Sequence, residues 1–182
     1  MVARGDLGVE TNPEDVPIHQ RTMVAECRKQ GKPCIVATQM LESMIDSPTP
    51  TRAEASDVAT AIFQGVDAVM LSAESAAGQY PQESVQMMDK IIKRVEADDK
   101  YKNNLTNYNL SHTKNTAEAI ARAAFNVAEI IDSNCLVTFS KSGRSIVRVS
   151  RMRPDVTLVG LTSDIKVARQ NALTWGTLMD VV

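Results

Sequence analysis

Short apolar runs that alternate with stretches of helical character constrain the fold of this chain more than any other feature. Residues 1–3, 34–37 and 68–71 are uninterrupted apolar runs, and a helical stretch separates each run from the next. Uninterrupted runs, as opposed to alternating ones, are typical of strands that are buried on both faces of a parallel sheet. The first half of the chain is therefore predicted to repeat a strand–helix unit and to have a parallel α/β fold.

The helices between these strands carry start and stop signals. Residues 18–30 have helical character and are followed by a glycine and a proline, which end the helix. A Thr-x-x-Glu capping box at residues 51–54 opens the next helix. Pro81 stands at the start of a third helix, predicted over residues 82–95.

The second half of the chain repeats the pattern after a polar stretch. Residues 96–113 are rich in Lys, Asn and Asp without a clear period, which predicts a domain boundary or an exposed connection. Beyond it, strands are predicted at 135–139, 157–161 and 177–182, with helices at 146–153 and 165–172. The helix before these strands is expected to bury one face, made by Ala117, Ile120, Ala121, Ala124, Ala128 and Ile131.

Composition and charge exclude several classes of function. The formal net charge of the 182 residues is −2, so no basic stripe is available to neutralise nucleic-acid phosphates. No apolar run approaches the roughly 18 residues of a membrane span. Neither nucleic acid nor a membrane is therefore an expected partner. The cysteines Cys27, Cys34 and Cys135 are odd in number and lack C-x-x-C spacing, which indicates a reducing, cytoplasmic compartment.

Polar side chains follow each predicted strand of the first half. Gly5 and Asp6 follow the first strand, Thr38 the second and Glu74 the third. The ends of parallel strands lie on one rim of a sheet, where α/β enzymes place their chemistry. An Asp without a neighbouring base suits a hard cation such as Mg²⁺, and a glycine lets backbone N–H groups approach an anion. The alternative is that these residues are turn formers and helix caps.

A second polar loop lies between a predicted strand and a predicted helix in the second half. Hydroxyls, a glycine and two cations before a helix N-terminus form a natural phosphate cradle. The G-x-x-x-x-G-K pattern of a P-loop is missing, and the alternative is an ordinary capped turn with solvated cations. The loop consists of Ser140, Lys141, Ser142, Gly143, Arg144 and Ser145.

Taken in order, these motifs resemble the pyruvate kinase family. Residues 2–10 (VARGDLGVE) are similar to its metal and substrate loop, and residues 37–44 (ATQMLESM) to its next strand and loop. The motifs at residues 50–59 and 70–81 continue the resemblance in the same order. Four such motifs in series are specific. The resemblance covers essentially the whole chain, with the later half matching more loosely.

The resemblance implies both an architecture and an activity. Residues 1–97 would be the last three strands of a partial (β/α)₈ TIM barrel, and residues 98–182 a partial, truncated α/β C-terminal domain. The family transfers the phosphoryl group of phosphoenolpyruvate to ADP, giving pyruvate and ATP in glycolysis. The implied cofactors are Mg²⁺ (or Mn²⁺) and K⁺, and the implied full-length parent is an allosteric, cytoplasmic homotetramer.

The resemblance also assigns roles to individual residues. Asp6 would be one of two carboxylates that bind the catalytic Mg²⁺. The backbone at Gly5 and Asp6 and the hydroxyl of Thr38, which is also the implied catalytic residue, would hold the carboxylate of phosphoenolpyruvate. Arg52 and Asp57 match a helix at a subunit interface, although Arg52 fits an exposed first-turn residue equally well.

Three hypotheses follow for the 182 residues themselves. The first is a fragment of pyruvate kinase that is inactive alone. The family's lysine, second metal carboxylate, potassium ligands and lid are not in this sequence, and three strands cannot close a barrel of about eight strands. The second is a regulatory module without catalysis, in which only the loop at 140–145 binds the phosphate of a sugar-phosphate effector. The third is another Mg²⁺-dependent barrel enzyme, such as an aldolase, which leaves the motifs at 37–44 and 50–54 unexplained.

Overall fold

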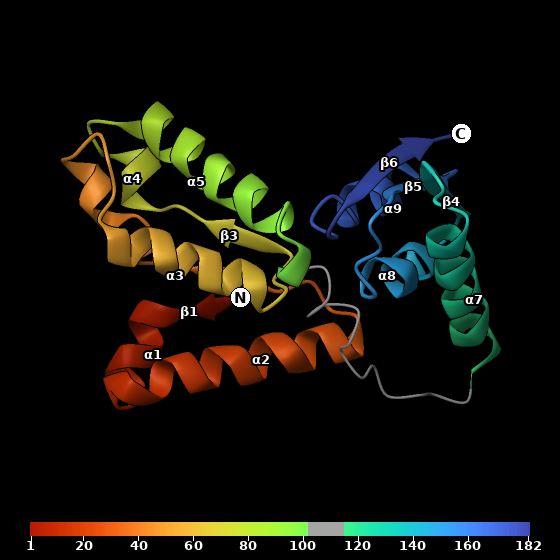
Figure 1. Cartoon of the computed structure of the whole chain (residues 1–182), viewed down its shortest axis with the longest axis horizontal. Coiled ribbons are helices and arrows are strands. Elements are labelled where there is room, and N and C mark those ends of the chain that lie inside the picture. The colour runs from red at the N-terminus through yellow and green to blue at the C-terminus, as the bar shows by residue number, and fades with distance from the viewer. Residues whose placement is uncertain (102–114) are drawn as a thin grey trace. The chain divides into compact units, whose positions relative to one another are not determined.

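The structure is a computed structural model that describes residues 1–101 and 115–182, and these residues fall into two units (Figure 1). Unit 1 holds residues 1–28 and 34–101, and unit 2 holds residues 29–33 and 115–182. Each unit contains a three-stranded sheet whose strands are all parallel. Among the described residues, no helix is long and apolar enough to cross a membrane.

The sheet of unit 1 has the strand order β1-β2-β3. Val2 pairs with Val36 and Ala37 with Met70, so the three strands end close to one another along the sheet edge. A helix connects each strand to the next, as a parallel pair requires. The predicted strand–helix repeat is confirmed. The elements are β1 (Val2–Ala3), α2 (Val16–Gln30), β2 (Ile35–Ala37), α3 (Arg52–Phe63), β3 (Ala68–Met70) and α5 (Pro81–Glu96).

The core of unit 1 includes the segment that follows β2 as well as the strand itself. Val36 and Ala37 of β2 are fully buried, and so is Val58 of α3, which packs beside α5. The fully buried side chains of Met40, Leu41 and Met44 come from the segment after the strand. The chain leaving β2 is therefore part of the packed interior, where side chains have fixed positions.

The capping box at the start of α3 is present as predicted. The Thr51 hydroxyl accepts a hydrogen bond from the backbone N–H of Glu54 at 3.2 Å, and the Glu54 carboxylate accepts from the backbone N–H of Thr51 at 2.7 Å. The same carboxylate accepts from the backbone N–H of Ser43 at 2.7 Å. Burial raises the pKa of Glu54, but the hydrogen bonds from Ser43 and Thr51 outweigh burial and hold this pKa below its usual range.

Unit 1 also contains short helices that the apolar pattern does not indicate. The residues directly after β1 form α1 (Arg4–Glu10), so Gly5 and Asp6 lie in a helical turn instead of an open loop. Pro13–Asp15 (η1) and Glu42–Ile45 (η2) form 3₁₀ turns, and α4 (Ala73–Ala76) follows β3. These helices have at most seven residues, which is too short for a visible helical period.

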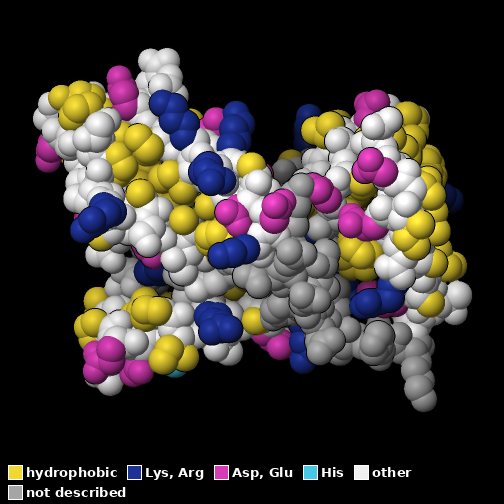
Figure 2. Space-filling view, viewed as in Figure 1, with side chains coloured by type: hydrophobic (Ala, Val, Ile, Leu, Met, Phe, Trp, Pro, Cys, Tyr) yellow, Lys and Arg dark blue, Asp and Glu magenta, His cyan; other side chains and the backbone are white. Residues whose placement is uncertain are grey.

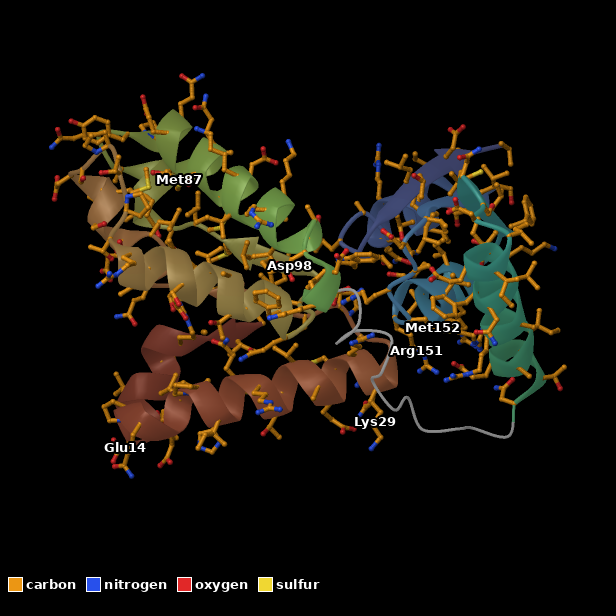
Figure 3. All side chains as sticks on the ribbon, viewed as in Figure 1. Glu14, Lys29, Met87, Asp98, Arg151 and Met152 are labelled. Carbon is orange, nitrogen blue, oxygen red and sulfur yellow. The ribbon has the colours of Figure 1, made fainter. Side chains whose placement is uncertain are left out.

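The sheet of unit 2 has the strand order β4-β5-β6, and each predicted strand and helix is found within a few residues. The core gathers side chains of α7, α8 and the sheet around Ile146 and Leu158, which are fully buried. Met152, labelled in Figure 3, follows α8 and belongs to this core. The elements are α7 (Thr116–Ile130), β4 (Cys135–Phe139), α8 (Arg144–Ser150), β5 (Thr157–Thr162), α9 (Ile165–Gln170) and β6 (Thr177–Val181).

The buried face of α7 is narrower than predicted. Ala121 and Ala128 are buried as expected, and Ala124 packs against the same core. Ile120 and Ile131, however, are 64% and 66% exposed, and Ala117 is exposed as well, so the predicted burial of these three residues is wrong. The small alanines let the helix approach the core along one thin stripe, which leaves the flanking isoleucines outside it.

The predicted polar connection lies mostly outside the described residues. Residues 102–114, which make up most of the stretch at 96–113, are not described. The division into domains at 97 and 98 therefore stays a prediction.

Candidate functional site

The structure brings two of the predicted site residues together at the ends of β1 and β2. The backbone N–H of Gly5 donates a hydrogen bond to Oγ1 of Thr38 at 2.9 Å. The Thr38 hydroxyl in turn donates to the carbonyl oxygen of Ala37 at 2.6 Å. The contact forms because β1 and β2 are parallel neighbours with Ala3 opposite Ala37, so the residues that follow both strands meet. A backbone N–H and a hydroxyl on one rim can bind an anion such as a carboxylate.

The backbone that presents the Thr38 hydroxyl has an unusual conformation. Thr38 has φ of 70° and Gln39 has φ of 53°. Both lie in the left-handed region, which residues other than glycine rarely adopt. Each such residue costs about 1–3 kcal/mol and persists only where surrounding contacts hold it. Strain of this kind clusters at functional sites, so the loop after β2 is a candidate site on its backbone geometry as well.

A buried arginine holds this loop in place. Arg4 is 9% exposed, and its Nη2 donates to the carbonyl oxygens of Thr38 and Gln39, both at 2.7 Å. Its Nε donates to the Thr38 carbonyl oxygen at 3.1 Å, and Nη2 also lies 2.9 Å from the sulfur of Met40. Sequence reasoning missed Arg4. The available signal was a cation directly after a buried strand, since arginines are rarely buried unless paired.

The carboxylate of Asp57 completes the environment of Arg4. Nη1 of Arg4 forms an ion pair with Oδ2 of Asp57, which lies on α3 and is 37% exposed. Arg52, the other predicted interface residue, is exposed in the first turn of the same helix. Asp57 therefore has a partner within its own chain. The interface role of Arg52 and Asp57 stays a prediction.

The two acidic side chains of the rim are in opposite environments. Asp6 is exposed on α1. Glu74 is 3% exposed, and its carboxylate accepts hydrogen bonds from the backbone N–H groups of Ser72 at 2.7 Å and Leu41 at 3.2 Å. Glu74 thus ties the segment after β2 to the segment after β3. Asp6 is the carboxylate of this pair that solvent or a ligand can reach.

The side chains at the rim fit a Mg²⁺ site that is completed by the substrate better than one made by protein ligands alone. In residues 1–101 and 115–182, no group of three His, Cys, Asp or Glu side chains lies close enough to hold a metal ion. Mg²⁺ is usually bound by one or two carboxylates together with substrate phosphate, and it retains several waters. An exposed Asp6 beside an anion-binding rim fits one protein ligand of such a site.

The second predicted loop is shaped by a glycine. Gly143 has φ of 74°, and a Cβ atom there would lie 2.1 Å from Nδ2 of Asn171. Ser140 is buried, and its hydroxyl accepts from the backbone N–H of Ser145 at 3.5 Å. The side chains of Lys141 and Arg144 are exposed. The loop therefore combines a backbone that only glycine fits with two cations that are free to meet an anion.

Comparison with known proteins gives the same relatives for both units. The family model described as "Pyruvate kinase, barrel domain" matches residues 1–85, and "Pyruvate kinase, alpha/beta domain" matches residues 118–181. A pyruvate kinase of Agrobacterium vitis is 50% identical over 176 residues, which are 97% of this chain and 36% of the relative. A pyruvate kinase of Clostridium acetobutylicum is 43% identical over 176 residues and is covered to 37%.

A solved structure shows the same likeness. The crystal structure of a pyruvate kinase from Cryptosporidium parvum matches with a TM-score of 0.92 and 36% sequence identity, over 98% of this chain and 37% of that chain. The chain thus spans a little over a third of the length of these relatives.

Proposed function

The chain belongs to the pyruvate kinase family, and from this premise we propose that unit 1 supplies one rim of the site that transfers the phosphoryl group of phosphoenolpyruvate to ADP, giving pyruvate and ATP. The observation that carries the proposal is the hydrogen bond from the Gly5 N–H to the Thr38 hydroxyl at 2.9 Å. It joins two anion-binding groups at the ends of neighbouring parallel strands, where barrel enzymes bind substrate.

The residues of the rim have separate tasks. The Gly5 N–H and the Thr38 hydroxyl bind the carboxylate of phosphoenolpyruvate, and Thr38 is the proposed catalytic residue because its hydroxyl touches the substrate. The hydroxyl, which donates to the Ala37 carbonyl oxygen in the structure, turns its hydrogen toward the bound carboxylate, and the Gly5 N–H is shared between Oγ1 of Thr38 and the carboxylate. Asp6 holds Mg²⁺, which when bound stabilises negative charge on the transferring phosphoryl group.

The 182 residues by themselves are proposed to be inactive. They span 36% of the Agrobacterium vitis relative, and their three-stranded sheet in unit 1 is well short of the roughly eight strands of a closed barrel. A coupled assay of pyruvate formation on the purified chain is expected to give no turnover above a protein-free blank. Measurable turnover that scales with the chain's concentration contradicts this part of the proposal.

A chimaera tests the catalytic rim. Residues 1–182 replace the matching segment of the Agrobacterium vitis pyruvate kinase, which supplies the rest of the enzyme. Asp6→Asn is expected to lower kcat/KM at least about 100-fold, because it removes the carboxylate that holds Mg²⁺. Thr38→Val is expected to lower it at least about tenfold, because it removes a hydroxyl that binds the substrate carboxylate.

The matched control for this experiment is Thr22→Val. Thr22 is an exposed threonine of α2 whose hydroxyl donates only within its own helix, to the Ile18 carbonyl oxygen. It is expected to leave kcat/KM within about twofold of the parent chimaera, since exposed surface substitutions have small effects. Normal kcat/KM in the Asp6→Asn variant removes Asp6 from the proposed site.

We also propose that the loop at residues 140–145 binds the phosphate of a sugar-phosphate effector, because Gly143 fixes its backbone while Lys141 and Arg144 are exposed. Calorimetry with fructose 1,6-bisphosphate and with ribose 5-phosphate tests this binding. Lys141→Ala is expected to weaken it, whereas Lys166→Ala, an exposed lysine of α9, is not. Absence of heat and of a thermal shift with both ligands counts against the effector site.

The remaining features that the family implies are proposals for the complete enzyme. They are a requirement for K⁺, a cytoplasmic location and a homotetramer in which α3, with Arg52 and Asp57, lies at a subunit interface. In the chimaera, Arg52→Glu is expected to lower the oligomeric mass measured by light scattering. An unchanged mass removes Arg52 from the interface.

A further inference from the structure

We propose that Arg4 is a positioning residue, which holds the Thr38 hydroxyl where the substrate carboxylate binds. This proposal rests on the proposed function. Arg4 is not itself a ligand for the substrate, because each of its nitrogen atoms already has an acceptor. Nε and Nη2 donate to the loop after β2, and Nη1 pairs with Asp57. The side chain is also buried, so a substrate in the rim does not reach it.

The acceptors of Arg4 are the backbone atoms whose orientation matters most. The two carbonyl oxygens that Nη2 contacts at 2.7 Å belong to Thr38 and Gln39, the two residues with positive φ. Holding both carbonyls fixes two successive peptide planes. The Thr38 side chain is attached to the backbone between β2 and these two planes. Fixing the planes therefore fixes the position of its hydroxyl oxygen, which accepts the hydrogen bond from the Gly5 N–H.

The guanidinium group suits this task and an ammonium group does not. The planar guanidinium carries five N–H donors in a fixed fork, whereas lysine places one compact charge at the end of a flexible stem. The contacts of Arg4 leave the fork in two directions, toward the Thr38 and Gln39 carbonyls and toward the Asp57 carboxylate. Arg4→Lys therefore keeps the charge and loses the geometry, which makes it the discriminating variant.

A kinetic test uses the chimaera that contains residues 1–182. Arg4→Lys is expected to raise KM for phosphoenolpyruvate at least about tenfold and to change KM for ADP less than about twofold, because only the carboxylate-binding loop relaxes. Arg21→Lys, at an exposed arginine of α2, is the matched control and is expected to change neither value. A KM for phosphoenolpyruvate within twofold of the parent in Arg4→Lys overturns the proposal.

A double-mutant cycle separates positioning from general support. If Arg4 acts through the Thr38 hydroxyl, Arg4→Lys has less than about a twofold effect on KM for phosphoenolpyruvate once Thr38→Val has removed that hydroxyl. An undiminished tenfold effect in the Thr38→Val background shows that Arg4 acts elsewhere and overturns the proposal.

Amide hydrogen exchange on the 182-residue chain tests the clamp without activity. The Gly5 amide, which donates to Thr38, is expected to exchange at least about tenfold faster in Arg4→Lys, while the Val36 amide in the middle of β2 stays within about threefold. Equal acceleration at Gly5 and Val36, including complete unfolding, overturns the clamp. Loss of turnover in the parent chimaera refutes the proposed function instead and leaves this exchange result to decide on Arg4.

Discussion

β2 and β4 are each followed by a loop with a proposed binding role, yet the two strands are built differently. β2 is the central strand of its sheet, and Val36 and Ala37 are fully buried. β4 stands at the edge of the described sheet of unit 2, and Val137 and Phe139 are 54% and 58% exposed. Figure 2 shows apolar side chains on the surface over α7 and β4.

The loops after these strands reach a left-handed backbone by opposite means. After β2, Thr38 and Gln39 adopt positive φ without glycine, and the buried Arg4 holds their carbonyls. After β4, Gly143 adopts positive φ without strain, and the Asn171 side chain lies where a Cβ atom on residue 143 would be. A strained loop with a clamp presents one side chain in a set orientation, whereas the glycine loop lets its backbone lie against the Asn171 side chain and leaves Lys141 and Arg144 exposed.

The largest expected difference between the two strands is in thiol reactivity. Burial, together with the neighbouring Cys27, raises the pKa of Cys34, the residue directly before β2, to about 12, whereas Cys135 is exposed at the start of β4. The raised pKa leaves about one Cys34 in ten thousand as the reactive thiolate at about pH 8. Iodoacetamide labelling with mass mapping is expected to modify Cys135 at least about 1,000-fold faster. Similar rates at the two cysteines contradict the buried environment of β2.

The next largest effect is expected from Gly143→Ala in the loop after β4. A Cβ there lies 2.1 Å from the buried Asn171 amide and requires a residue at φ of 74°, so we expect a loss of about 2–3 kcal/mol in the free energy of unfolding. Gly176→Ala is the matched control, since Gly176 has φ of 62° and nothing within 4 Å of its Cβ position.

The fluorescence of Trp175, the one tryptophan of the sequence, reports urea unfolding of unit 2. The Gly176→Ala control is expected to cost about 1 kcal/mol, which is the price of positive φ alone. Equal losses in the two variants show that the contact with Asn171 does not shape the loop.

A smaller contrast is expected between the helix caps of the two units. Glu54 caps α3 with a lowered pKa, whereas α7 is capped by the neutral Asn115, which accepts from the Ala117 N–H at 2.9 Å. A carboxyl whose pKa is lower in the folded state adds stability above its unfolded pKa and loses it as the pH falls through the folded pKa.

Unit 1 is therefore expected to lose stability on acidification below about pH 4.3, the ordinary Glu value. Glu54→Gln is expected to remove that portion of the loss, by about 1 kcal/mol or less. Amide exchange within α3, measured between neutral and acidic pH, checks the slope. An unchanged slope in Glu54→Gln excludes this carboxyl as its source, and Asn115→Asp is the converse test in α7.

The smallest effect is expected from Gln39→Gly. Gln39 is exposed and has φ of 53°, so glycine relieves backbone strain while making the unfolded chain more flexible. These terms nearly cancel, and we expect a change of less than about 1 kcal/mol in the free energy of unfolding, toward greater stability. Thermal unfolding of unit 1 followed by circular dichroism measures it. A clear destabilisation means that the Gln39 side chain makes a contact that supports the loop.

Much of the fold follows from local patterns. The strand predicted at 135–139 is found as Cys135–Phe139, and the capping box at residues 51–54 begins α3. Apolar runs, caps and turn residues act over a few positions, so their effects are visible in sequence. The exposed Ile120 and Ile131 show the limit of such patterns. A helical period indicates which face of a helix is buried, but it does not indicate how wide that buried face is.

The candidate site divides along the same line. The sequence by itself determined that Gly5, Asp6 and Thr38 follow buried strands, because strand ends are set by local composition. Only the tertiary structure decided that the buried Arg4 binds the carbonyl oxygens of the two residues with positive φ. It also decided that Glu74 is buried and joins the segments after β2 and β3, while Asp6 stays exposed. These environments depend on contacts between residues more than 30 positions apart, such as Arg4 with Thr38 and Leu41 with Glu74, and no local pattern encodes them.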